Sequence, residues 1–241
     1  MTWVEVVVAG LLLVGALVQR VAGLGIGLVC VPPLVMLLGP LDGVSLSNSA
    51  SSVLSAFSLL AVWREVQVRT MLPLAAAAAC TVPAGAWVAH HLPAPLLLTG
   101  MGAAVTVAVL LVIRGARVSA LHGRKGAVTA GAVSGFMNAT AGVGGPAVSL
   151  WALNAGWTAK QFLPNSLFFL FLVNGLSVLT KGPPRLAAPA WLLAGAGVAI
   201  GGLIGRRLEK RIPEAPARRL LLMLALAGGL ATLGKGLAGL G

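Results

Sequence analysis

Two glycine-rich stretches interrupt apolar segments of this 241-residue chain and could bring backbone groups to a ligand. They read Ala22-Gly23-Leu24-Gly25-Ile26-Gly27 and Ala141-Gly142-Val143-Gly144-Gly145-Pro146. Glycine lets a ligand approach the backbone closely, and a helix that restarts after a break offers free N–H groups and the positive end of its dipole. Close helix packing through small residues is the alternative. Because the pattern occurs twice, we favour an anion site.

Polar side chains accompany both stretches. Gln19 and Arg20 precede the first and Asn138 the second, while Asn48-Ser49 and Asn165-Ser166 open the following segments 117 residues apart. An intramembrane arginine indicates function by default, although Arg20 could instead snorkel to an interface. The candidate substrate-binding residues are Gln19, Arg20, Gly23, Gly25, Gly27, Asn48, Ser49, Ser52, Asn138, Gly142, Gly144, Gly145, Asn165 and Ser166.

Ser52 belongs to a polar stripe of serines around Asn48, which either lines a pore or joins helices by hydrogen bonds. The five Asp and Glu residues fall near segment ends or in loops, so the usual intramembrane proton relay or carboxylate cation site is missing. The three histidines lack metal-ligand spacing. We therefore expect an anion substrate, no cofactor, no metal and no catalytic residue.

The composition places these residues in a membrane. Apolar residues make up 58% of the chain and charged residues only 9%, against roughly 25% charged in soluble domains. The apolar segments are long and do not alternate with period two, which indicates helices and not a barrel. The net charge of +12 is interpreted as loop charge that sets topology, because no basic domain exists for nucleic acid.

The apolar segments predict two copies of one unit. Six of them have the length of one bilayer crossing, about 20 residues, whereas 4–38 and 126–155 are longer and contain the glycine-rich breaks. We predict an all-α polytopic membrane protein of two inverted repeats, each a re-entrant helical hairpin followed by three transmembrane helices. The first repeat would span 1–113 and the second 126–241, joined by a basic cytoplasmic linker at 114–125.

Basic residues favour this topology. If both broken segments return to the side from which they enter, the loops 64–70, 114–125, 156–160 and 206–215 share one side and carry eleven Lys and Arg residues. If every segment instead crosses once, the two most basic loops fall on opposite sides, against the positive-inside rule. Inverted repeats are common in secondary transporters.

The stretches around Gly23 to Gly27 with Pro32-Pro33, and from Gly131 and Gly135 to Gly142 through Pro146, resemble the TauE/SafE family. The first copy departs from the family pattern, since Leu24 and Ile26 separate its glycines. The resemblance implies an exporter of sulfite, sulfoacetate or a similar sulfonate. We expect it to work by alternating access at a mid-membrane site formed by the two glycine-rich breaks. A passive anion channel and an intramembrane enzyme are the alternatives.

We expect a multi-pass protein of the cell (inner) membrane whose partners are a small organic or inorganic anion and membrane lipid. Nucleic acid is excluded, and the interpretation allows a homodimer.

Overall fold

The computed structural model describes residues 3–22, 26–114, 123–208 and 214–240. These residues form ten α-helices and one short 3-10 helix. The elements are α1 (Trp3–Ala22), α2 (Ile26–Leu38), α3 (Pro40–Val62), η1 (Trp63–Glu65), α4 (Val68–His91), α5 (Ala94–Ile113), α6 (Gly123–Ala141), α7 (Gly145–Asn154), α8 (Ala159–Lys181), α9 (Ala188–Leu208) and α10 (Glu214–Ala238).

The second five α-helices follow the order and spacing of the first five. α2 and α7 begin 119 residues apart, at Ile26 and Gly145, and α3 and α8 do so as well, at Pro40 and Ala159. Both sets consist of a broken pair followed by three long helices. The inverted orientation of the two sets across a bilayer stays a prediction.

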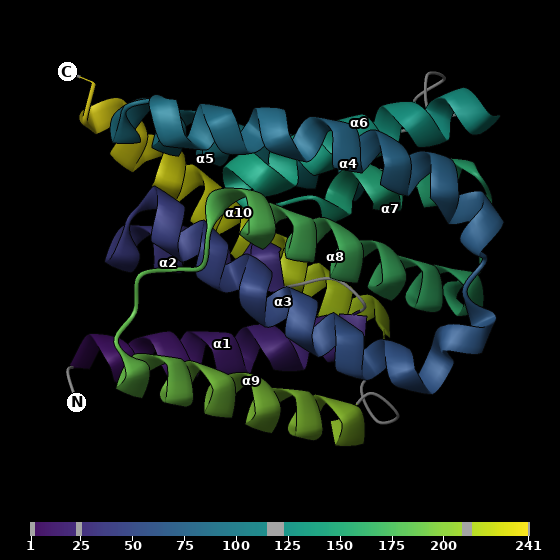
Figure 1. Ribbon diagram of the computed structural model, residues 1–241, viewed down its shortest axis with the longest axis horizontal. Coiled ribbons are helices and arrows are strands. Elements are labelled where there is room, and N and C mark those ends of the chain that lie inside the picture. The colour runs from purple at the N-terminus through teal and green to yellow at the C-terminus, as the bar shows by residue number, and fades with distance from the viewer. Residues whose placement is uncertain (1–2, 23–25, 115–122, 209–213, 241) are drawn as a thin grey trace.

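The helices run between two ends of the molecule in Figure 1. α1 begins at the left, and α2 returns there before α3 crosses to the right. α6 and α7 form the corresponding hairpin from the right-hand end. The ends of α3, α7 and α9 therefore lie at the right-hand end, whereas α1 begins and α10 ends at the left.

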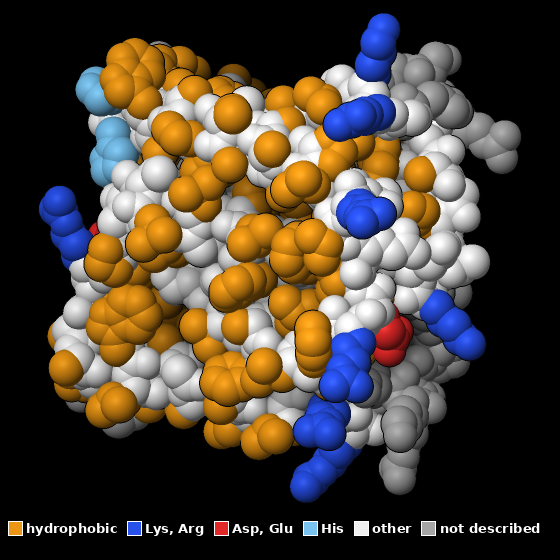
Figure 2. All heavy atoms as spheres, turned by 45° about the vertical axis from the view of Figure 1, so that its right-hand side comes forward, with side chains coloured by type: hydrophobic (Ala, Val, Ile, Leu, Met, Phe, Trp, Pro, Cys, Tyr) orange, Lys and Arg blue, Asp and Glu red, His pale blue; other side chains and the backbone are white. Residues whose placement is uncertain are grey.

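An apolar surface connects these ends. Figure 2 shows hydrophobic side chains over the middle of the face in view, with most of the visible Lys and Arg side chains gathered toward its right-hand side. Six helices in the described residues are long and apolar enough to cross a membrane. The prediction of an all-α polytopic membrane protein is confirmed.

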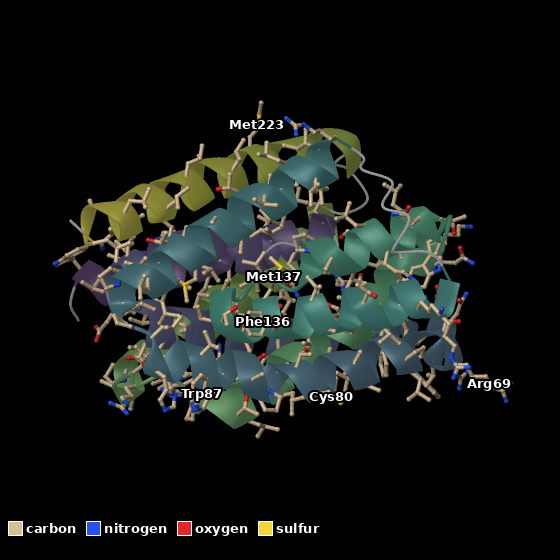
Figure 3. All side chains as sticks on the ribbon, turned by 90° about the horizontal axis from the view of Figure 1, so that it is seen from above. Arg69, Cys80, Trp87, Phe136, Met137 and Met223 are labelled. Atoms are coloured by element: carbon tan, nitrogen blue, oxygen red, sulfur yellow. The ribbon has the colours of Figure 1, made fainter. Side chains whose placement is uncertain are left out.

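Small residues bring the long helices into close contact. α6 packs on α4 where Gly131 faces the backbone of Leu74 and Gly135 faces that of Ala78. Figure 3 shows α4 extending from Arg69 past Cys80 to Trp87, beside the α6 residues Phe136 and Met137. α9 packs on α1 in a similar way, with Gly197 and Gly201 against the α1 backbone. Such small-residue contacts replace the hydrophobic driving force that lipid removes.

Cysteine labelling tests the predicted topology. Leu41 at the start of α3 and Ala155 after α7 are both exposed, and they occupy opposite ends of the molecule. In a background lacking Cys30 and Cys80, we expect Leu41→Cys to react with an impermeant maleimide from outside intact cells. Ala155→Cys should react only after the cells are opened, because the basic end faces the cytoplasm. Labelling of both from one side would contradict the inverted arrangement.

Candidate functional site

The start of α2, directly after the first break, meets the second helix break inside the protein, and the two line one small polar cavity. Gly27 at the start of α2 faces the carbonyl group of Gly142 so closely that a Cβ atom at Gly27 would overlap it. The absence of a side chain on Gly27 therefore lets the breaks touch. The cavity is lined by Gln19, Gly27, Leu28, Ser47, Asn48, Ser51, Asn138, Gly142, Val143, Gly144, Gly145, Leu170 and Asn174.

The second break has a well-defined geometry. Gly142 ends α6 in the left-handed conformation (φ 65°), and its N–H donates to the Asn138 carbonyl over 2.9 Å, as in the αL cap of helix C-termini. The Ser134 hydroxyl donates to the Gly144 carbonyl over 2.6 Å. α7 then starts at Gly145, so the positive end of its dipole and its first N–H groups lie at the cavity.

A chain of hydrogen bonds fixes one wall of the cavity. The Ser51 hydroxyl donates to Gln19 Oε1 over 2.8 Å, and Gln19 Nε2 donates to Ser55 Oγ over 3.0 Å. Asn174 Nδ2 of α8 donates to Ser51 Oγ over 3.0 Å. This chain joins α1, α3 and α8, and all four side chains are buried or nearly so. The wall is therefore a built polar surface.

Asn138 plays the corresponding part at the second break. Its Nδ2 donates to Ser177 Oγ over 3.0 Å, which ties α6 to α8. Asn138 lies 119 residues after Gln19, the same interval that separates α2 from α7. Each break thus has an amide side chain, four residues before the first glycine, that anchors it to the following long helix.

Two polar atoms at the cavity have no hydrogen-bond partner among the described residues. They are Ser47 Oγ and Asn48 Oδ1, on side chains that are 0% and 1% exposed. Asn48 Nδ2 donates weakly to the Asn138 carbonyl over 3.4 Å. Leaving a buried polar group unsatisfied costs about 1–3 kcal/mol. These atoms are therefore the ones most available to a ligand.

The cavity is small, with a volume of about 20 Å³. This is enough for roughly one water-sized group, which needs about 10–15 Å³ on this measure. None of the described residues that line it carries a titratable side chain. The arrangement offers hydrogen bonds and a helix dipole, and admitting a polyatomic ion requires the surrounding helices to move apart.

Seven of the residues that the sequence suggested for binding line this cavity. They are Gln19, Gly27, Asn48, Asn138, Gly142, Gly144 and Gly145. Gly23 and Gly25 lie outside the described residues.

The other five candidates lie elsewhere. Asn165 caps the start of α4, since its Oδ1 accepts from the N–H of Gln67 over 2.8 Å, and Ser166 donates to the carbonyl of Leu163 in its own helix. Ser52 donates to the Phe171 carbonyl of α8. Arg20 and Ser49 line a second, larger cavity between α1, α3 and α9.

Three polar residues of the small cavity were not among the predicted binding residues. Ser51 belongs to the predicted polar stripe, and Ser47 lies one position before Asn48. Asn174 lies 119 residues after Ser55. The glycine-rich breaks repeat after 119 residues, whereas the Asn-Ser pairs repeat after 117. Applying the interval of 119 residues to the polar stripe would have predicted Asn174.

The comparison with known families decides the class of protein. The family model described as "Sulfite exporter TauE/SafE" matches residues 7–232. The chain belongs to the TauE/SafE family. The chain is therefore a membrane transporter of a family that exports sulfite and related sulfur anions. Both helix breaks lie within the matched region. No curated protein and no solved structure matches the chain significantly.

The contact between the breaks can be tested by adding one methyl group. Gly27→Ala must displace the Gly142 carbonyl, and such overpacking costs about 1–3 kcal/mol. We expect this TauE/SafE variant to melt several degrees lower and to transport its substrate more slowly. Gly10→Ala on α1 is the matched control, because a Cβ there meets no atom within 4 Å. Equal melting temperatures of the two variants would show that the breaks do not need this contact.

Proposed function

We propose that this protein exports a small sulfur oxyanion, such as sulfite or a small organosulfonate, through the cavity at the two helix breaks. The observation that carries the proposal is the pair of buried atoms without partners, Ser47 Oγ and Asn48 Oδ1, beside the N-terminus of α7. The family match supports the class of substrate. The direction is outward across the cell membrane, with the basic loops in the cytoplasm.

The polar atoms suit an oxyanion that still carries one proton. The Ser47 hydroxyl and the first N–H groups of α7 can donate to charged oxygens, and such charge-assisted bonds contribute about 1.5–3 kcal/mol each. Asn48 Oδ1 can accept the remaining O–H of hydrogensulfite, whereas a sulfonate monoanion has no such proton to donate. Leu28, Val143 and Leu170 close the rest of the cavity with apolar groups, which favours the monoanion over a doubly charged ion.

A matched pair of serines on α3 tests the binding site. Ser47 lines the cavity, whereas Ser49 donates to the Ser45 carbonyl of its own helix over 2.8 Å. We expect Ser47→Ala to weaken sulfite binding about tenfold, because one hydrogen bond to a charged group is lost. Ser49→Ala should bind sulfite with unchanged affinity in isothermal titration calorimetry. Equal affinities for both variants would move the substrate away from this cavity.

The charges of the described residues also suggest how export is driven. Among the carboxylates whose side chains the structure describes, Glu5, Asp42 and Glu65 lie near helix ends and line neither cavity. A coupled cation therefore has no evident carboxylate ligand there. An anion that leaves a cell with a negative interior gains about 2.3 kcal/mol per charge per 100 mV, which corresponds to roughly a fiftyfold concentration ratio for a monoanion.

We expect an imposed potential, negative inside, to drive sulfite efflux from proteoliposomes without a pH or sodium gradient. Efflux should increase with the potential, and protein-free liposomes are the control. Counter-flow of labelled sulfite would distinguish a carrier from a passive channel, which conducts without exchange. Efflux that ignores the potential and follows a pH gradient would mean that a proton is carried as well.

A further inference from the structure

A second cavity lies between α1, α3 and α9 and is separate from the polar cavity at the breaks. Its volume is about 500 Å³, within the roughly 300–1,000 Å³ typical of ligand sites. α9 packs closely on α1 but touches α3 at few points, so the space is a cleft between the α1–α9 pair and α3. We call it the lateral cleft.

The walls of the lateral cleft are almost entirely apolar. Val53 and Phe57 of α3 line it and are 50% and 70% exposed, and Leu203 of α9 is 63% exposed. On a spanning helix such exposure is to hydrocarbon and not to water. The cleft is therefore open to the bilayer, and its walls do not suit a small hydrophilic anion on its way to the polar cavity.

Two arginines line the lateral cleft toward one end. Arg206 lies in the last turn of α9. The aliphatic stem of Arg20 packs against Gly205, where an added Cβ atom would lie only 2.7 Å from Arg20 Cβ. Both therefore lie near the end of the molecule where α9 finishes, the right-hand end in Figure 1. None of the described residues that line the cleft is acidic.

The cleft extends along most of the spanning length. Its lining residues run from Trp191 to Arg206 on α9, which is about 22 Å at a helical rise of about 1.5 Å per residue. The hydrocarbon core of a bilayer is about 30 Å thick. A long apolar groove with positive charge at one end has the shape and polarity of a lipid with an anionic headgroup.

We propose that the lateral cleft binds an anionic phospholipid, with an acyl chain along Val53, Phe57 and Leu203 and the phosphate group at Arg206 and Arg20. Basic sites between transmembrane helices on the cytoplasmic side are suited to such headgroups. The proposal goes beyond substrate export, because the substrate is assigned to the other cavity.

The two cavities share one helix, so the lipid would act on the transport site. Ser47, Asn48 and Ser51 of α3 face the polar cavity, whereas Leu46, Ala50 and Val53 face the lateral cleft. An acyl chain in the cleft would support the part of α3 around Val53 and Phe57, which is exposed. The lipid would then hold α3 against the helix breaks.

Filling the cleft tests the acyl-chain part of the proposal. A Cβ at Gly195 meets no atom within 4 Å, so Gly195→Leu places a side chain in the cleft without backbone strain. We expect this variant to lose bound phosphatidylglycerol in native mass spectrometry of the purified full chain. Gly10→Leu, which also enters open space but lines neither of the two cavities, should retain it. Ala199→Leu is a second cleft-filling variant in case Gly195→Leu does not fold.

Removing charge tests the headgroup part. Arg206 lines the cleft and its neighbour Arg207 does not. We expect Arg206→Gln to weaken phosphatidylglycerol binding about tenfold and to leave phosphatidylcholine binding unchanged, whereas Arg207→Gln should change neither.

Four results would overturn the proposal. The first is equal binding of the two lipids by the unmodified protein. The second is displacement of phosphatidylglycerol by inorganic phosphate at the same concentration, which would indicate a plain anion site. The third is a dimer that dissociates in Gly195→Leu, which would make the cleft an interface between two copies. Undiminished lipid binding by both cleft-filling variants would overturn it as well.

Discussion

Backbone groups that leave helical hydrogen bonding inside a bilayer must find partners within the protein, and both helix breaks depend on this requirement. At the second break, the Asn138 carbonyl accepts from the Gly142 N–H and from Asn48 Nδ2, and Ser134 satisfies the carbonyl of Gly144. These partners belong to α6 and α3. A break can therefore exist only where those helices pack against it. A substrate can bind only to the polar atoms that form no hydrogen bond with the backbone.

The same requirement gives α3 two different faces. The face toward the breaks carries Ser47, Asn48 and Ser51. Ser51 forms hydrogen bonds with Gln19 and Asn174, and Asn48 Nδ2 donates to a carbonyl near the end of α6. Ser47 Oγ and Asn48 Oδ1 have no hydrogen-bond partner among the described residues. The opposite face carries Leu46, Ala50 and Val53 along the lateral cleft. Because a helix advances about 100° per residue, alternating polar and apolar positions can serve two cavities at once. α3 is thus the element on which both proposed sites depend.

Much of the fold could be predicted from the sequence, because lipid restricts spanning segments to long apolar helices and glycine marks their interruptions. The breaks and the roles of Gln19 and Asn138 beside them follow from the same patterns. The Asn-Ser pairs suggested an interval of 117 residues, but helix starts at Ile26 and Gly145 differ by 119. That shift of two positions rotates a helix by about 200°, so Asn165 was expected at the cavity and Asn174 was missed. The side on which Arg20 lies depends on how α1 packs on α9, which no local pattern specifies.

The packing of the two helix pairs differs in a way that matters for a carrier. In the repeated order of helices, α4 corresponds to α9 and α8 to α3. α4 packs broadly against α8, whereas α9 meets α3 at few contacts and leaves the lateral cleft between them. A transition between two states needs alternative packings of similar free energy. The protein contains a tight contact, α4 with α8, and the corresponding loose contact, α9 with α3, at the same time.

For the proposed exporter, an exchange in which the α1–α9 pair closes on α3 while the α4–α6 pair separates from α8 would move the opening from one side of the breaks to the other. The contacts of Gly197 and Gly201 with α1, and of Gly131 and Gly135 with α4, would stay intact during such a movement, because they lie within each pair.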